Sequence, residues 1–364
     1  MNDVVLFQEL ACANGKRIGI AQLNSEKTLN ALSLAMIRVL YPQLQQWAQD
    51  DAIVAVFLQG AGEKAFCAGG DVKHICLAVR ANGIDDTTAE ELFAAEYRLD
   101  YFIHCFPKPM MVWATGIVMG GGIGLLCGAS HRIVTETSRL AMPEISIGLY
   151  PDVGGSWFLG RLGKVGLFLG MTAANINAQD ALNINLANFS AQSSQRQAII
   201  DALTAIDWSN DSTEHGQQIT QLLSQYRYSA LAASQLETHQ AEIEQRTSAT
   251  NFSQLYQQLT APSEQTWLNK AAQTLKAGSP TSAALIYRQW QNGQQQSLAD
   301  CFRQELILSV QCARHADFIE GVRALLVDKD QNPQWQPPSI AQLSEAYLDE
   351  HYQSPWAVHP LADL

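Results

Sequence analysis

Residues 110–127 read MMVWATGIVMGGGIGLLC, and the three consecutive glycines inside this stretch decide the fold. They stand between an apolar run typical of a β-strand and an apolar run typical of a helix. Glycine is destabilising by roughly 0.5–1 kcal/mol relative to alanine inside regular structure. A second stretch, AFCAGGD at residues 65–71, repeats the arrangement. We therefore expect another group to come close to the backbone at both places.

Strand-like and helix-like runs alternate through the first half of the chain. We predict strands at residues 17–24, 52–60, 110–116 and 131–136, and helices at residues 31–49 and 88–106. This alternation favours an α/β architecture. From about residue 187 the chain is rich in glutamine and helical in pattern, and Ser279-Pro280 opens a further helix. We divide the chain into an α/β core, residues 1–187, and a helical region, residues 188–364.

Composition narrows the class of protein. The 364 residues are 47% hydrophobic, as in ordinary globular proteins, and the net charge is −12. An acidic chain is a poor partner for nucleic acid or for an anionic membrane surface, so we expect neither. The seven cysteines are an odd number without CxxC spacing, which indicates reduced thiols. Because the opening residues lack the pattern of a signal peptide, we predict a cytoplasmic location.

Glycine-rich turns that open a helix expose backbone N–H groups, and two chemistries use such groups. One is phosphate binding and the other is an oxyanion hole. The dinucleotide fingerprint GxGxxG fails because Cys127 stands where its last glycine is required. Neither a GK[ST] phosphate loop nor a GxSxG nucleophile elbow is present. Two loops that each offer one N–H to the same oxygen remain, with tight helix–strand packing as the structural alternative.

Three carboxylates are candidates for catalysis. Glu144 follows a proline among apolar residues, and Asp152 follows a proline eight positions later. A carboxyl group in apolar surroundings has a raised pKa, which suits a general base. Asp152 could equally be the N-cap of a helix that starts near Gly154. Glu96 shares a helix face with apolar residues, so its carboxylate is predicted to point toward the interior.

Taken together, EKAFCAGGDVKHI (63–75), GIVMGGGIGL (116–125) and RLAMPEISIGLYPDVGGSWFLGRLG (139–163) resemble the crotonase, or enoyl-CoA hydratase/isomerase, superfamily. SPTS (279–282) and DFIEGVRALLVDKDQNPQW (317–335) narrow the resemblance to its 3-hydroxyisobutyryl-CoA hydrolase branch. The resemblance implies an α/β fold, a crotonase-like spiral of ββα units with a helical C-terminal extension. It also implies an acyl-CoA substrate, whose thioester oxygen the N–H groups of Gly70 and Gly121 would bind.

The resemblance further implies the reaction. Enoyl-CoA hydratases carry a glutamate where this chain has Gly124, so hydration, which uses two carboxylates on one water, is disfavoured. Glu144 and Asp152 match the hydrolase branch, and Glu96 matches one of its substrate-contacting residues. We expect cleavage of 3-hydroxyisobutyryl-CoA, a step of valine catabolism, with Glu144 as general base or nucleophile. The alternatives are an enoyl-CoA hydratase or isomerase on the same scaffold, and a non-catalytic acyl-CoA-binding protein.

The remaining expectations concern binding. Cys67 and Ala68 in the first glycine loop, together with Lys73, are predicted to contact the substrate. No histidine is evidently paired with Cys67, so a nucleophilic role for its thiol is disfavoured. Lys27 and Lys73 are candidates for the coenzyme A phosphates, or are simply solvated. We expect no metal and no cofactor other than the coenzyme A of the substrate, and the sequence leaves assembly into a homo-oligomer open.

Overall fold

The computed structural model describes residues 3–364 of the protein. Its internal contacts divide the chain into two compact units, and each unit is assembled from segments far apart in the sequence. The first unit comprises the segment that ends at Gly70 and residues 102–140 and 176–234. The second comprises residues 71–101, 141–175 and 235–364.

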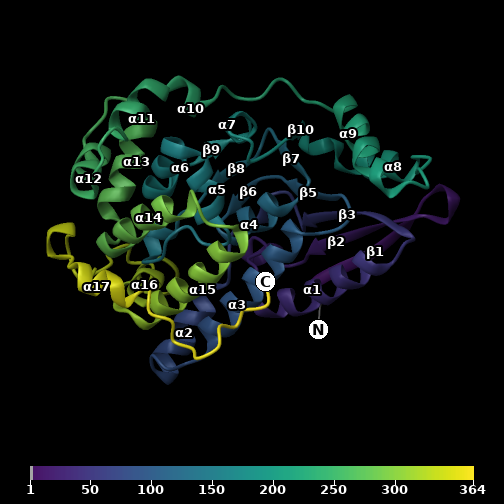
Figure 1. Ribbon diagram of the computed structural model, residues 1–364. Helices are drawn as coiled ribbons and strands as arrows, with labels where there is room; N and C mark the ends of the chain where they lie inside the picture. Colours follow the sequence, from purple (N-terminus) through teal and green to yellow (C-terminus); the bar gives the residue numbers. More distant parts are fainter. Residues whose placement is uncertain (1–2) are drawn as a thin grey trace. The chain divides into compact units, whose positions relative to one another are not determined.

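A six-stranded sheet forms the framework of the first unit, with its strands in the order β1-β2-β3-β5-β7-β10 (Figure 1). The strands are β1 (Val5–Ala11), β2 (Arg17–Leu23), β3 (Ile53–Gly60), β5 (Met110–Ala114), β7 (His131–Thr135) and β10 (Phe189–Ala191). The β1–β2 pair is antiparallel, and all the other pairs are parallel. β3 and β5 are buried along their whole length, which explains why their sequences read as continuous apolar runs rather than as alternating ones.

Four short strands form a second sheet in the order β4-β6-β8-β9. They are β4 (Ala65–Cys67), β6 (Ile117–Met119), β8 (Arg139–Ala141) and β9 (Ile176–Asn177). β4 and β6 pair in parallel, and each of them runs directly into one of the two glycine stretches. Parallel strands present their carboxyl ends at the same edge of a sheet, so both glycine stretches leave this sheet at one edge.

Helices pack against the sheet of the first unit. They are α1 (Leu34–Gln49), α4 (Gly121–Gly128), α7 (Ala178–Asn183), α8 (Arg196–Thr204) and α9 (His215–Gln225). Ser33 caps α1, because its side chain accepts a hydrogen bond from the Met36 N–H. One apolar core joins β2, β3, β5 and β7 to α8 and α9, with Phe57, Trp113 and Trp208 among its largest side chains.

The second unit is helical. Its longer helices are α2 (Val72–Asn82), α3 (Thr88–His104, of which the last three residues belong to the first unit), α5 (Gly155–Arg161), α6 (Gly163–Thr172), α11 (Gln240–Arg246), α12 (Phe252–Thr260), α13 (Thr266–Ala277), α14 (Pro280–Gly293), α15 (Leu298–Arg314) and α16 (Ala316–Val322). Shorter helices are α10 (Gln235–Thr238) and α17 (Glu345–Glu350). The chain also contains the short 3₁₀ turns η1 (Ala13–Gly15), η2 (Glu26–Thr28), η3 (Glu144–Ile147), η4 (Ser193–Gln195), η5 (Ser212–Glu214) and η7 (Ile340–Gln342), and the π-helix η6 (Arg323–Val327).

The elements predicted from the sequence are found with small shifts at their ends. All four predicted strands and both predicted helices are present, and Ser279 caps α14 with Pro280 as its first residue, as expected. Six strands were not predicted, namely β1, β4, β6, β8, β9 and β10. Of these, β10 lies after residue 187 and pairs with β7. The division into an α/β core, residues 1–187, and a helical region, residues 188–364, stays a prediction. The strand β10 of the six-stranded sheet lies beyond residue 187. Among residues 3–364 no helix is long and apolar enough to cross a membrane.

Candidate active site

The two glycine stretches lie side by side in the first unit. A Cβ atom on Gly122 would lie 2.4 Å from the carbonyl oxygen of Cys67, so only glycine fits at position 122. On the other strand, Gly69 has φ +109°, and a Cβ there would lie 3.4 Å from the Met119 carbonyl oxygen and 3.9 Å from the nitrogen of Gly121. Close approach of the two backbones therefore requires glycine at position 122, and the positive φ requires it at position 69.

Each stretch leaves one main-chain N–H available at this edge. Gly121 is the first residue of α4, and N–H groups in the first turn of a helix have no acceptor within the helix. Gly70 forms an isolated parallel bridge with Leu32, in which the Leu32 N–H donates to the Gly69 oxygen at 2.8 Å. In a parallel bridge of this kind, the Gly70 N–H is directed away from Leu32. Two N–H groups from neighbouring backbones can bind one anionic oxygen.

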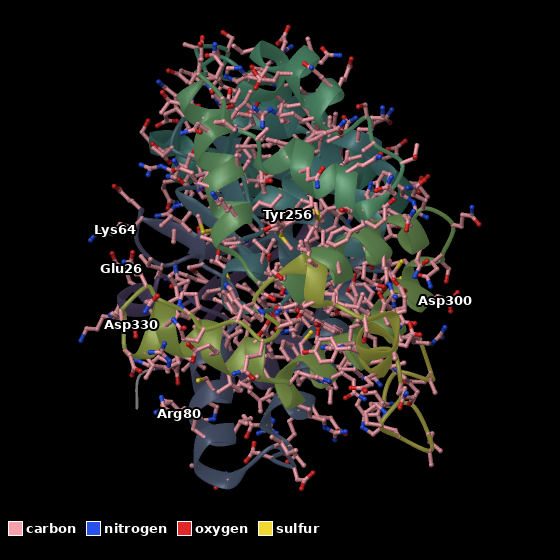
Figure 2. The ribbon with its side chains drawn as sticks, turned by 90° about the vertical axis from the view of Figure 1, so that its left-hand side faces the viewer. Glu26, Lys64, Arg80, Tyr256, Asp300 and Asp330 are labelled. Carbon is pink, nitrogen blue, oxygen red and sulfur yellow. The ribbon has the colours of Figure 1, made fainter. Side chains whose placement is uncertain are left out.

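The structure places the other predicted contacts of these loops as follows. Cys67 is buried, and its thiol lies 3.7 Å from the Gly69 oxygen, while Ala68 is half-buried. Lys73, on α2, and Lys27 are both exposed. Figure 2 labels Glu26, which precedes Lys27, and Lys64, and both of these side chains are exposed. Substrate contact by Cys67, Ala68 and Lys73 stays a prediction.

Glu144 and Asp152 belong to one segment of the second unit. Glu144 opens the short turn η3 directly after Pro143, and both carboxyl groups are buried, with residues 5% and 4% exposed respectively. Between them Gly148 has φ +71°, and a Cβ at that position would lie 2.3 Å from the backbone of Asp317. The segment can therefore turn only at glycine, and the turn carries both acids into the interior.

The helix α3 supplies two more buried carboxyl groups. Glu96 is 2% exposed, as the apolar helix face predicted, and Asp100 lies one turn further along and is fully buried. One oxygen of Glu96, one of Glu144 and both of Asp100 have no hydrogen-bond partner among the described residues. Buried carboxyl oxygens without partners are costly unless the group is protonated or a ligand completes it.

We define the carboxyl cluster as Glu96, Asp100, Glu144, Asp152 and Glu305, the last of which lies on α15. Burial, and then the nearby charge of Asp152, raises the pKa values of Glu96 and Glu144 well above their ordinary range. Burial and the charges of Glu96, Asp152 and Glu305 do the same to the pKa of Asp100. Burial raises the pKa of Asp152 to about 6, although a hydrogen bond from Tyr97 opposes this rise. The cluster therefore retains protons at pH values where free carboxyl groups have lost them.

Asp152 does not cap a helix. The N-cap of α5 is Gly154, and the N–H groups of Gly154 and Ser156 donate to the carboxylate of Glu305 instead. One oxygen of Asp152 accepts a hydrogen bond of 2.5 Å from the hydroxyl of Tyr97. Of the two interpretations left open by the sequence, the structure therefore excludes the capping one. The first N–H groups of α5 therefore do not occupy the Asp152 carboxyl group.

Sequence reasoning missed three residues of this site, namely Tyr97, Asp100 and Glu305. Glu305 could have been found, because it lies on the same face of α15 as Phe302 and Leu306, where a charged residue is unexpected. Asp100 repeats Glu96 at a spacing of four residues and carried the same signal. Tyr97 carried none, since its hydrogen-bond partner is far away in the sequence.

Comparison with known proteins places the chain in a family. A family model described as enoyl-CoA hydratase/isomerase matches residues 18–352. The chain is 39% identical over 355 residues to the mitochondrial 3-hydroxyisobutyryl-CoA hydrolase of Danio rerio, covering 96% of this chain and 89% of that protein. It is 35% identical over 357 residues to the human protein of the same name, covering 97% and 89%.

Two solved structures are similar over almost the whole chain. One is described as an enoyl-CoA hydratase from Rhodobacter sphaeroides (TM-score 0.84, 29% identity, 97% of this chain and 98% of that one). The other is described as a carnitinyl-CoA dehydratase from Mycobacterium thermoresistibile (TM-score 0.86, 30% identity, 99% and 98%). These structures share the crotonase fold that the sequence predicted. By sequence and by fold, the chain belongs to the enoyl-CoA hydratase/isomerase, or crotonase, family.

Proposed function

We propose that this protein hydrolyses 3-hydroxyisobutyryl-CoA to 3-hydroxyisobutyrate and coenzyme A, a step in the breakdown of valine. The observation that carries the proposal is the buried pair Glu144 and Asp152, each with a raised pKa and without a cation among the groups that shift it. A protein that only binds acyl-CoA has no need to bury these acids. The curated relatives named above support the choice of thioester.

Gly124 argues against the hydratase alternative. Hydration of a double bond needs two carboxylates on one water, and hydratases of this family carry one of them where this chain has Gly124 on α4. The solved structures bear names of hydratases and dehydratases, whereas the curated relatives bear the name of a hydrolase. The reaction must therefore be decided by assay rather than by fold.

In the proposed mechanism, the N–H groups of Gly70 and Gly121 bind the thioester oxygen as it becomes negative. One such donor contributes about 10²–10³ in rate. Glu144 either takes a proton from water as the water oxygen bonds to the carbonyl carbon, or attacks that carbon itself. In both cases the C–S bond of the tetrahedral intermediate then breaks, and coenzyme A leaves as a thiolate with little need for an acid, because a thiol has a pKa near ~8.5. The first route gives the acid directly, and the second gives an anhydride with Glu144 that water then cleaves.

Asp152 and Glu96 have supporting roles in this mechanism. Asp152 orients the attacking water or the 3-hydroxyl of the substrate, and Glu96 helps to hold that hydroxyl. The unpartnered oxygens of Glu96 and Glu144 are available to such a ligand. The mechanism requires the N–H groups of Gly70 and Gly121 to act on the same substrate as Glu96, Glu144 and Asp152. It requires no metal and no cofactor beyond the coenzyme A of the substrate.

The test is an assay with matched substrates, in which the loss of thioester or enoyl absorbance is followed. We expect rapid cleavage of 3-hydroxyisobutyryl-CoA and slower cleavage of 3-hydroxypropionyl-CoA. Isobutyryl-CoA, which lacks only the hydroxyl, should react about 10²-fold or more slowly, because buried polar groups would be left unpaired. Hydration of crotonyl-CoA would establish a hydratase instead, and inertness toward all four esters would leave only binding.

An isotope experiment separates the two roles of Glu144. In a single turnover in H₂¹⁸O, a general base delivers ¹⁸O directly to the acid product. An anhydride that water cleaves at the Glu144 carbon leaves ¹⁸O in the protein, where mass spectrometry of the peptide that contains Glu144 detects it. Label in that peptide supports the nucleophile.

The cellular location and the assembly state belong to the same proposal. We place the protein in the cytoplasm, whereas the names of the curated relatives place those proteins in mitochondria. All seven cysteines are free thiols, which agrees with any reducing compartment. Cell fractionation tests the location. Sedimentation tests whether the chain forms a homo-oligomer.

A further inference from the structure

The helix α15 carries a buried carboxyl group that the proposed mechanism does not use. Glu305 is fully buried, and both of its oxygens are occupied by donors from the segment that follows Asp152. One oxygen accepts the Gly154 N–H at 2.7 Å, and the other accepts the Ser156 N–H at 2.9 Å and a short hydrogen bond from the Ser156 hydroxyl. Glu305 therefore ties the backbone directly after Asp152 to α15.

The backbone at this place adopts a conformation that needs support. Val153 has φ +53°, in the left-handed region that β-branched residues strongly avoid, and Gly154 follows with φ +85°. The Gly155 N–H closes the turn on the carbonyl oxygen of Asp152 at 2.7 Å. Strained turns of this kind persist only where surrounding contacts hold them. The hydrogen bonds that Glu305 accepts come from Gly154 and Ser156, which lie one and three residues after Val153.

A second tether runs from the same helix to the side chain of Asp152. Ser309 lies one turn after Glu305, and its hydroxyl is 2.6 Å from the Tyr97 hydroxyl, which donates to Asp152. The hydroxyl of Tyr150 donates to the main-chain oxygen of Glu305 at 2.7 Å and lies 2.9 Å from that of Ser309. The helix α15 thus holds Asp152 through its backbone and through its carboxyl group.

We propose that Glu305 is a positioning residue for the reaction, which fixes the strained turn at residues 152–154 and so aims the Asp152 carboxyl group. This inference rests on the proposed function for its meaning in catalysis. Three hydrogen bonds from Gly154 and Ser156 engage the oxygens of Glu305, and the proposal gives this residue no contact with the substrate. Its effect must pass through the placement of Asp152.

The experiment compares Glu305→Gln, Ser156→Ala and a matched control, Asp317→Asn. Glu305→Gln keeps the size of the side chain but presents an NH₂ group to a donor. Asp317 is also a buried carboxyl group of the second unit, and it accepts the Ser279 hydroxyl at 2.6 Å and the Gln336 N–H at 2.7 Å. It makes no hydrogen bond to residues 152–156, so its variant reports the general effect of losing a buried carboxyl group that accepts hydrogen bonds.

We expect Glu305→Gln to lower kcat about 10- to 100-fold with KM within about threefold, as for a misplaced catalytic group. Ser156→Ala removes one hydrogen bond and should lower kcat about three- to tenfold. Asp317→Asn should keep kcat within about twofold of the wild-type value, even if it lowers the melting temperature as much as Glu305→Gln does. Crystal structures of the three variants should show the bond between Asp152 and Tyr97 broken in Glu305→Gln and kept in Asp317→Asn.

Each outcome supports or overturns the proposal. It is overturned if Asp152 stays in place in Glu305→Gln, or if Asp152 moves and kcat does not change. If Glu305→Gln fails to fold, an unchanged kcat in Ser156→Ala overturns it. A wild-type protein that does not cleave the thioester refutes the proposed function separately, while the crystal structures still decide whether Glu305 positions Asp152.

Discussion

The hydrogen bond between Tyr97 and Asp152 offers the sharpest test of the site. Replacing Tyr97 by phenylalanine removes the hydroxyl that donates to Asp152 at 2.5 Å and leaves the buried ring in place. The carboxylate of Asp152 accepts this bond, so the bond stabilises its charged form and lowers its pKa. Without this hydrogen bond, less remains to oppose the effect of burial, which raises the pKa, so the pKa of Asp152 must rise.

The size of the change follows from the strength of the bond. A hydrogen bond to a charged group is worth about 1.5–3 kcal/mol, and one pKa unit corresponds to about 1.4 kcal/mol. The pKa of Asp152, about 6 in the intact protein, should therefore rise by about 1–2 units in Tyr97→Phe. If Asp152 acts as a carboxylate, kcat near pH 6 falls about tenfold and recovers as the pH approaches about 9.

The assay is the pH dependence of kcat, followed by the loss of thioester absorbance so that protein thiols do not interfere. The matched control is Tyr150→Phe, which removes a hydroxyl from the same network without removing a bond to Asp152. In that control the acidic limb of the profile should stay where it is. Because the carboxyl cluster titrates as a unit, the limb is compared between variants as an apparent pKa. An unshifted limb in Tyr97→Phe would refute the role given to this bond.

Three further predictions address the other parts of the site. Glu144→Gln should lower turnover by about 10²–10⁴-fold while calorimetry shows unchanged binding of the acyl-CoA, and retained activity would contradict the assignment. Gly122→Ala places a methyl group 2.4 Å from the Cys67 carbonyl oxygen, so kcat should fall about tenfold or more. The control is Gly216→Ala, whose added methyl group would have its nearest neighbouring atoms at 3.8 Å, and this variant should stay active. Burial raises the pKa of Asp100, so the wild-type protein loses stability as the pH rises and this buried group must give up its proton. Asp100→Asn lacks this titration, so its melting temperature relative to that of the wild type should increase from pH 5 to pH 8. A constant difference in melting temperature would contradict the raised pKa.

Much of the fold could be predicted because burial leaves a local pattern. The strand β3 is buried at every position, so its sequence is a continuous apolar run that can be recognised without neighbours. The strand β10 has three residues and is defined by its pairing with β7, which a local pattern does not contain. For the same reason, the order of the strands in each sheet could not be read from periodicity.

The candidate site divides in the same way. Glu144, Asp152 and Glu96 could be found because an acid among apolar residues is visible in the sequence. The choice between a catalytic and a capping role for Asp152 could not be made, because the carboxyl group that accepts the Gly154 and Ser156 N–H groups at the start of α5 is that of Glu305, on a distant helix. Local reasoning identifies a buried acid. It does not identify the partners that a tertiary fold brings to it.

The parallel pairing of β4 and β6 has a consequence for how such a protein diversifies. Adjacent parallel strands are about 4.8 Å apart in any sheet, and here each strand leads to one of the two proposed oxyanion donors. The distance between the two proposed donors is thus set by main-chain geometry, which side-chain substitutions hardly alter. Carboxyl residues outside the two glycine stretches can be gained, lost or moved along the chain. The reaction can then change while the proposed binding site of the thioester oxygen stays the same.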